Sequence, residues 1–388
     1  MSLPDMKLIY LDHNATTPIE SEAVRLMDLY VKKEFGNPSS GYELGIRAKE
    51  GVEKARQEVA DLINCKAGEL IFTSGGSESN NMVLKGISGL DSLKGKHIIT
   101  SAIEHPAIIN PAMYLMELGA DVTFLPVDNY GRVHPDDVKN SIRPETILIS
   151  IMLANNETGT LQPIKEISKI AKEYSIPFHT DAAQAVGKIK VDVKELGVDF
   201  MSIAGHKLYG PKGVGALYIK EGKELTPLIH GAGQEMGKRA GTENVVLATG
   251  LGAACRVAKE KLAKDAGEIK KLRDLLQELL FNGIDDLVLN GHPGERLPNT
   301  LNVSIPGVDG GKLLGMLDNV VASTGAACHD RSVKLSHVLS AMGVTLEVGM
   351  GTLRLTLGRL NDREQIETAA SQIIGAAKKM KKDSYDNR

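Results

Sequence analysis

The chain has 388 residues, of which 42% are hydrophobic and 24% are charged, and its formal net charge is −3. This composition is typical of a globular protein of roughly two or three domains. The small net charge and the 4% of aromatic residues argue against a basic or base-stacking nucleic-acid surface. No stretch approaches the roughly 20 apolar residues of a membrane span, and the first residues lack a signal peptide's apolar core. We therefore expect a cytoplasmic protein that contacts neither nucleic acid nor a membrane directly.

Strand and helix patterns alternate through the first two-thirds of the chain. Alternation of this kind predicts an α/β fold in which helices cover a mostly parallel sheet, with ligands bound beyond the carboxyl ends of the strands. The predicted strands are 96–100, 121–127, 145–152, 177–180, 199–203 and 213–219, and the predicted helices are 108–118 and 163–174.

The last third of the chain predicts a second, smaller α+β domain. A charged helical stretch at 259–280 is expected to lead out of the first domain. The polar end, residues 378–388, is expected to fray. Beyond the connecting helix, the predicted strands are 300–305, 320–324 and 353–357, and the predicted helices are 310–317 and 363–379.

The three cysteines are Cys65, Cys255 and Cys328. An odd number without a Cys-x-x-Cys pair argues against a disulfide framework and against a structural zinc site, so no metal is expected. Cys255 lies in a helical pattern and is predicted to belong to the core, whereas Cys65 carries no functional signal. Cys328 follows small residues and precedes a polar stretch, which predicts an exposed loop.

A glycine-rich turn follows the strand that begins near Glu69. It reads Ser74-Gly-Gly-Ser77 and leads into a helical pattern, with Ser77 as the expected N-cap. Free backbone N–H groups at a helix N-terminus bind anions such as phosphate. An ordinary glycine turn is the alternative explanation.

Two further predicted strands end in groups that carry chemistry. Asp181 follows the strand at 177–180, and a buried carboxylate there needs a cationic partner, such as a protonated pyridine nitrogen. Lys207 follows the strand at 199–203, where desolvation lowers an amine's pKa and makes it a nucleophile toward a carbonyl cofactor. Taken alone, Lys207 could equally be a surface lysine in a loop.

Together these features resemble a fold-type I pyridoxal-phosphate enzyme, and the detailed pattern is similar to the class V group of cysteine desulfurases and selenocysteine lyases. The resemblance implies a large domain at 17–257 with a mostly parallel seven-stranded sheet. It also implies a smaller α+β domain, formed by 1–16 and 258–388, that carries the catalytic cysteine loop. The matching stretches occur in the family's order at 10–18, 35–39, 72–80, 104–105, 154–159, 179–184, 205–211, 239–244, 297–300, 323–328 and 353–359.

The resemblance implies pyridoxal 5′-phosphate as cofactor and gives four residues roles around its ring. Lys207 matches the Schiff-base lysine, which also moves the proton at the substrate's α-carbon. Asp181 matches the acid on the pyridine nitrogen, and Gln184 the partner of the phenolic oxygen. His105 matches the histidine stacked on the ring, for which the resemblance also implies an acid/base role; alone, it would be a helix-start histidine before Pro106.

Further residues match the family's phosphate and polar contacts. Gly76, Ser77 and His206 correspond to phosphate contacts. Thr242 matches a threonine that reaches the phosphate of the neighbouring subunit, which implies a homodimer with shared sites. Asn155 matches a polar group near cofactor and substrate.

The resemblance also implies how a substrate is held and attacked. Arg354 matches the arginine that binds the substrate carboxylate, and Asn14 a polar group beside the substrate. Cys328 matches the nucleophile that removes sulfur from L-cysteine, leaving L-alanine and a persulfide. A mobile loop would then deliver the sulfur to an acceptor protein, such as an iron–sulfur scaffold or a tRNA-thiolation enzyme.

Two departures from the family's pattern affect these expectations. Ala204 stands where the family often has a phosphate-binding serine. The stretch Gly325-Ala-Ala-Cys-His329 is more similar to selenocysteine lyases, so selenocysteine lyase is the alternative function. An aminotransferase, a nicotinamide dehydrogenase suggested by the glycines at 231–237, and a non-catalytic scaffold are the other hypotheses. The glycine spacing at 231–237 is wrong for a dinucleotide fingerprint.

Overall fold

The computed structural model describes residues 8–87, 89, 93–329 and 332–386. For 326–329, 332–334 and 384–386 it describes the backbone alone. Within these residues no helix is long and apolar enough to cross a membrane.

The large sheet has seven strands, as expected from the resemblance. Strand β8 is antiparallel to both of its neighbours, and the other four pairings are parallel. The strand order across the sheet is β2 (Leu70–Thr73), β8 (Gly215–Ile219), β7 (Phe200–Ala204), β6 (Phe178–Asp181), β5 (Thr146–Ser150), β3 (His97–Ser101) and β4 (Asp121–Leu125).

Helices cover both faces of this sheet, which is why its central strands read as continuous apolar runs. Successive residues of one strand enter different cores: Ile99 packs in the first cluster and Ile98 in the second. The first cluster is closed by α2 (Glu43–Ile63), α6 (Ile164–Glu173), α7 (Val193–Leu196) and the start of α8 (Val245–Gly283). The second is closed by α3 (Gly76–Gly86) and α4 (Pro106–Glu117). Helices α1 (Ser21–Lys32) and α5 (Pro135–Ser141) complete this part of the chain.

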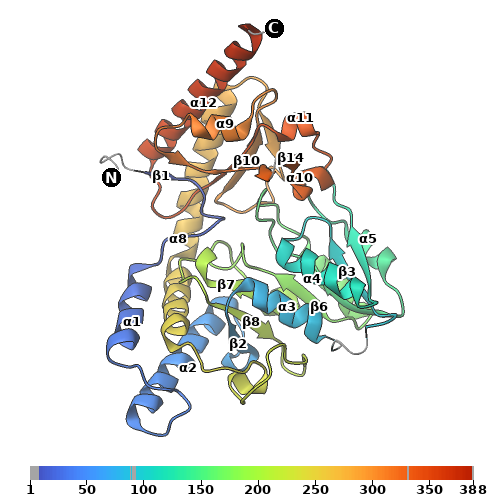
Figure 1. Ribbon diagram of the computed structural model, residues 1–388, viewed down its shortest axis with the longest axis vertical. Helices are drawn as coiled ribbons and strands as arrows, with labels where there is room; N and C mark the ends of the chain where they lie inside the picture. Colours follow the sequence, from blue (N-terminus) through green and yellow to red (C-terminus); the bar gives the residue numbers. More distant parts are fainter. Residues whose placement is uncertain (1–7, 88, 90–92, 330–331, 387–388) are drawn as a thin grey trace.

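Helix α8 begins at Val245, well before the predicted 259–280, and extends over 39 residues. The Asn244 side chain caps it by accepting a hydrogen bond from Leu247 N. Its glycine-rich first turns look like poor helix, but a Cβ on Gly252 would come within 2.6 Å of Ala55 in α2. Close packing against α2 therefore overrides the local propensity. Figure 1 shows α8 running from the large sheet to the C-terminal sheet.

A second sheet and core lie at the far end of α8 (Figure 1). The cluster joins Ile9 and Leu11 to Leu276 and Leu280 of α8 and to residues of α12 (Arg363–Asp386). Strand β1 (Ile9–Tyr10) pairs in parallel with β11 (Val320–Val321), so the N-terminal segment joins the C-terminal part. The domain boundaries given above stay a prediction. The sheet has the order β12 (Ser323–Thr324), β15 (Thr352–Thr356), β10 (Thr300–Ser304) and β9 (Val288–Asn290), and α9 (Gly310–Gly315) packs nearby.

Two predictions about loops and ends are wrong. The Cys328 segment is not a simple loop, because β13 (Ala326–His329) and β14 (Ser332–Leu335) form an antiparallel hairpin with Cys328 opposite Val333. Alternating polar and apolar residues in Ser332–Leu335 favour this strand. The C-terminal end that was predicted to fray is helical as far as Asp386. Helices α10 (His337–Ala341) and α11 (Leu346–Gly349) follow the hairpin.

Candidate active site

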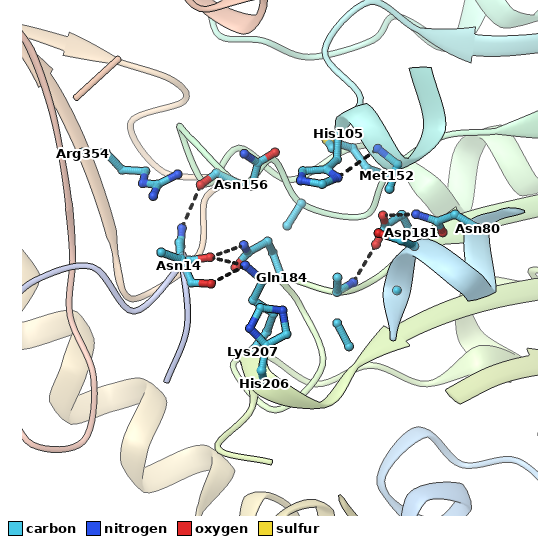
Figure 2. A pocket seen from close by; sticks show the side chains of 17 residues that line it. Asn14, Asn80, His105, Met152, Asn156, Asp181, Gln184, His206, Lys207 and Arg354 are labelled. Carbon is cyan, nitrogen blue, oxygen red and sulfur yellow. Dashed lines mark hydrogen bonds between the residues drawn. The ribbon is translucent and has the colours of Figure 1, made fainter. Parts of the chain in front are cut away.

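The predicted site residues gather around a cavity of about 370 Å³ at the carboxyl ends of β6 and β7. Nine of them line it directly, together with Ala204. The N-terminal segment and β15 close the other side, so the cavity lies between the two sheets (Figure 2). The nine are Asn14, Gly76, Ser77, His105, Asp181, Gln184, His206, Lys207 and Arg354.

Lys207 lies in the short 3-10 helix η3 (Gly205–Lys207) that follows β7. Its Nζ donates to the carbonyl oxygens of Asn14 (2.6 Å) and Ala15 (2.8 Å). Burial, and then the positive charge of Arg354, lower the pKa of Lys207 to about 8. A neutral amine is therefore accessible near physiological pH, as a Schiff-base lysine requires.

Asp181 ends β6 and is buried, with 8% of its surface exposed. Asn80 Nδ2 donates to its Oδ2 at 2.7 Å, and Ala183 N donates to its Oδ1 at 2.9 Å. These partners are neutral donors, which orient the carboxylate without neutralising its charge. A cation in the cavity, such as a protonated pyridine, would complete its environment.

The N-terminus of α3 lines the cavity where an anion cradle was predicted, but its cap differs from the prediction. The N-cap is Gly75, whose φ of +151° strongly favours glycine, and Ser77 lies in the first turn. The first N–H groups of a helix have no intrahelical partner, so those of Gly76 and Ser77 suit a phosphate. A Cβ on Gly76 would lie 3.4 Å from the Ala204 methyl.

His206 lines the same cavity as a neutral group. Burial, followed by repulsion from Lys207, lowers its pKa to about 4. Its Nδ1 hydrogen-bonds Thr16 Oγ1 at 3.2 Å. The ring's other nitrogen remains for a ligand, which fits the expected phosphate contact.

His105 is both a helix-start histidine and a cavity residue. Its Nδ1 accepts from Ala107 N at 3.1 Å and caps α4, so the proton of the neutral ring is on Nε2. Burial lowers the pKa of His105. The neutral imidazole suits stacking on a ring and exchange of a proton.

No role was predicted from the sequence for the preceding residue, Glu104. Its side chain is fully buried, and its Oε1 accepts from Ser101 Oγ (2.7 Å) and Met152 N (2.9 Å). Burial raises the pKa of Glu104 to about 8, so it is protonated at neutral pH. It therefore ties the strands behind His105 together as a neutral group.

Arg354 enters the cavity from β15. It is held by the carboxylate of Asp12, for which no role was predicted from the sequence. Its Nη2 donates to Asp12 Oδ1 (2.8 Å) and to Ser323 Oγ (3.0 Å). Ser323 Oγ donates in turn to Asp12 Oδ2 at 2.9 Å. Arg354 Nε is buried and has no partner among the described residues. The guanidinium thus has donor capacity left for a carboxylate ligand.

The structure corrects the position of one asparagine. The Asn155 side chain faces away from the cavity: it donates to Ile103 O and accepts from the backbone N–H groups of Glu157 and Thr158. Its neighbour Asn156 lines the cavity instead, and Asn156 Oδ1 has no partner among the described residues. Two adjacent asparagines in a turn give no sequence signal for which one points inward.

Asn14 links the N-terminal segment to the site. Its backbone oxygen accepts from Gln184 Nε2 at 2.9 Å, and its Nδ2 donates to Asn156 O (3.1 Å) and Thr300 Oγ1 (3.0 Å). Figure 2 shows Asn14 bridging Gln184 and Asn156.

Besides Asn155, Thr242 is not among the residues that line the cavity, and the position of Cys328 is not tested. Thr242 is exposed and lies beside a different hollow, together with Ser74 and Arg239. This placement leaves its expected reach toward a neighbouring subunit as a prediction. The Cys328 side chain lies outside the described part of the chain. In the described part, no group of three or more His, Cys, Asp or Glu side chains could hold a metal ion.

A desolvated lysine, a buried carboxylate and a helix N-terminus around one cavity define the site of a fold-type I pyridoxal-phosphate enzyme. The orphan donor Arg354 Nε fits an anionic group of an occupant, and the orphan acceptor Asn156 Oδ1 fits one of its N–H or O–H groups. Residues 9–368 match the family model described as aminotransferase class-V. The chain belongs to this family, and its cofactor is pyridoxal 5′-phosphate.

Individual relatives within the family describe the similarity in more detail. The chain is 50% identical over 360 residues to cysteine desulfurase IscS of Dictyoglomus turgidum, covering 92% of this chain and 91% of the relative. A solved NifS-like protein is 36% identical with a TM-score of 0.89, covering 95% of this chain and 99% of that one. The structure of SspA in complex with cysteine is 37% identical with a TM-score of 0.80, covering 90% of this chain and 98% of that one.

Proposed function

We propose that the protein is a cysteine desulfurase that converts L-cysteine to L-alanine and leaves a persulfide on Cys328. The observation that carries the proposal is the convergence of Lys207, Asp181 and Arg354 on one cavity. The similarity to cysteine desulfurases over almost the whole chain supports the same activity. The comparisons give the selenocysteine lyase alternative no support.

The cofactor would be held by groups from three elements. Gly76 and Ser77, with His206, are the proposed phosphate contacts, Asp181 the partner of the pyridine nitrogen, and Gln184 that of the phenolic oxygen. When bound, pyridoxal phosphate supplies an electron sink for the substrate's α-carbon. Because the phosphate cradle lacks a serine at Ala204, its donors come from backbone N–H groups and His206.

The substrate's amino-acid end would be fixed by Arg354 and the asparagines beside it. A guanidinium held by Asp12 and Ser323 retains donors for the α-carboxylate. Lys207, as a neutral amine, removes the proton from the α-carbon and later returns it. His105 carries its proton on Nε2 and would exchange it on the side of the site opposite to Lys207.

Sulfur transfer requires a reactive thiol, and two of the three cysteines are unsuited to it. Cys255 is fully buried, and burial raises the pKa of its thiol and that of Cys65. We assign the nucleophile to Cys328. Its thiolate forms a bond to the substrate sulfur while the carbon–sulfur bond breaks, and the β-carbon gains a proton. Cysteine and the thiol thus become alanine and a persulfide, with atoms and electrons balanced.

The later fate of the sulfur and the assembly of the protein are further parts of the proposal. The persulfide would pass to an acceptor protein in iron–sulfur cluster assembly or tRNA thiolation. A homodimer is proposed because Thr242 lies away from the cavity of its own chain. The two-domain division at 17–257 and at 1–16 with 258–388 is likewise proposed, supported by the separate core joined to Ile9 and Leu11.

The test is alanine release from cysteine by the wild type and by Cys328→Ala, both loaded with cofactor. We expect the variant to keep the cofactor's visible colour and to lose turnover of cysteine. Full activity in the variant would contradict the assignment of the nucleophile. Lys207→Ala should lose the visible band of covalently held cofactor.

A further inference from the structure

A second lysine, Lys188, points its side-chain amine at the residues of the cofactor site. It lies in the turn that follows β6, four residues after Gln184. Its Nζ donates to Gln184 Oε1 at 2.6 Å and to Asn14 Oδ1 at 3.0 Å. Both acceptors belong to residues that line the cavity.

The amide of Gln184 is held at both ends. Its Nε2 donates to the Asn14 carbonyl oxygen, so its Oε1 faces Lys188, which supplies a donor to that oxygen. An amide nitrogen carries two hydrogens, and the second remains available for the cavity. Lys188 therefore holds the amide oxygen of Gln184, which does not face the ligand. As a consequence, the second N–H of the Gln184 amide is fixed in orientation.

Asn14 is held in the same way and extends the network to Lys207. Its Oδ1 accepts from Lys188 and from Asn299 Nδ2 (3.0 Å), and its backbone oxygen accepts from Lys207 Nζ. One buried lysine amine thus joins the Gln184 turn to the N-terminal segment against which Lys207 rests.

The position is costly for a cation, which argues that the network needs a donor there. Burial, with repulsion from Lys207 and Arg354, lowers the pKa of Lys188 well below its ordinary value. None of the ion pairs in the described chain includes Lys188. Lys188 contributes to the lowered pKa values of His13 and His206. The other titratable groups nearby are Tyr209, Asp265 and Arg359, which line a second cavity together with His13 and Lys188.

We propose that Lys188 is a positioning residue that clamps Gln184 to Asn14 and so fixes the donor that Gln184 presents to the cofactor's phenolic oxygen. This inference rests on the proposed function, because it assigns Lys188 a task toward the same cofactor. It predicts that Lys188 acts through Gln184.

The test is a double-mutant cycle with Lys188→Met and Gln184→Met, read by pH titration of the bound cofactor's visible absorption band. A donor to the phenolic oxygen favours its ionised form. Loss of that donor therefore favours the protonated state of the bound cofactor. Lys188→Met should therefore raise the titration midpoint, by about one pH unit. In the Gln184→Met background the same substitution should produce less than half of that shift.

Two controls keep the result interpretable. Lys190→Met changes a lysine two residues along whose side chain is 70% exposed and pairs with Glu195, and it should leave the midpoint unchanged. Lys188→Arg retains a donor and covers the case in which Lys188→Met does not fold; its midpoint should stay within a few tenths of a unit of the wild type.

An equal shift in both backgrounds would overturn the inference, because Lys188 would then act only through its charge. An unshifted midpoint in Lys188→Met, or a Lys188→Arg midpoint displaced by a full unit, would also overturn it. Alanine release from cysteine by the wild type is measured in parallel. Its absence would contradict the proposed function, whereas its presence with additive shifts would contradict only the role of Lys188.

Discussion

Arg354 and Asp12 form an ion pair of 2.8 Å that joins strand β15 to the N-terminal segment, residues that are 342 positions apart. Only about 15% of either side chain is exposed. Ser323 forms hydrogen bonds with both Asp12 and Arg354. These contacts hold the guanidinium in one orientation, in which its Nε has no partner among the described residues. The proposed carboxylate site is therefore built by residues of three separate segments.

Removing the charge of Asp12 should weaken the hold on the substrate rather than stop the chemistry. We expect Asp12→Asn to raise the KM for cysteine by about five- to tenfold, since loss of this restraint costs about 1 kcal/mol, and to change kcat less. Steady-state kinetics measure both. Inhibition by cysteamine, which lacks a carboxylate, should be unaltered, and an equal loss for both compounds would refute a role in carboxylate binding.

The lowered pKa of Lys207 predicts how cofactor capture depends on pH. The neutral amine is the reactive form, so the rate at which cofactor-free protein captures pyridoxal phosphate should rise with pH and level off above about 8. Growth of the visible band in a stopped-flow experiment measures this rate, with a lysine-containing peptide as reference. Arg354→Met removes a repelling charge and should raise the midpoint. A wild-type rate that is still climbing at about pH 10, as for an ordinary lysine, would contradict the assignment.

Glu104 predicts a pH-dependent stability. Because burial raises its pKa to about 8 from an ordinary value of 4.5, the native state keeps a proton that the unfolded chain has lost between these pH values. The stability from this group is complete below about pH 4.5 and is lost as the pH rises through 8. Glu104→Gln cannot ionise, so its Tm relative to the wild type should increase from pH 6 to pH 8. A constant difference between the two proteins would show that Glu104 does not titrate there.

The adjacent asparagines should have separable effects. Asn155→Ala leaves buried backbone donors without a partner and should destabilise the protein by about 1–3 kcal/mol. Asn156→Ala removes a cavity side chain and should lower kcat/KM for cysteine roughly tenfold with little change in stability. Chemical denaturation and steady-state kinetics on both variants distinguish the two. Equal effects of both substitutions on kcat/KM, at unchanged stability, would contradict the structure's placement of Asn155.

The sequence predicted best the groups that end buried strands. Asp181 and Lys207 each follow an apolar run, and parallel strands bring their carboxyl ends to one edge of the sheet. Lys188 and Glu104 gave no such signal, because a charged residue in a turn normally faces water. Each contacts a segment distant in sequence, Lys188 the N-terminal segment at Asn14 and Glu104 the backbone of Met152.

Other differences have equally local causes. The sequence predicted helical segments around Cys255 and at 259–280, but not that one continuous helix begins at Val245; the glycines near Gly252 permit its close contact with α2. Asp12 was passed over because a carboxylate in a short strand-like segment carries no chemistry by itself. Its partner Arg354 lies near the other end of the chain, and the pairing arises only when β1 and β15 enter the same core.

The most direct test of the central claim is alanine release by the wild-type holoenzyme from L-cysteine and from L-selenocysteine, side by side, with a reductant present to remove the persulfide. We expect alanine from cysteine at a rate comparable to or above that from selenocysteine. Rapid turnover of selenocysteine with almost no alanine from cysteine would contradict it.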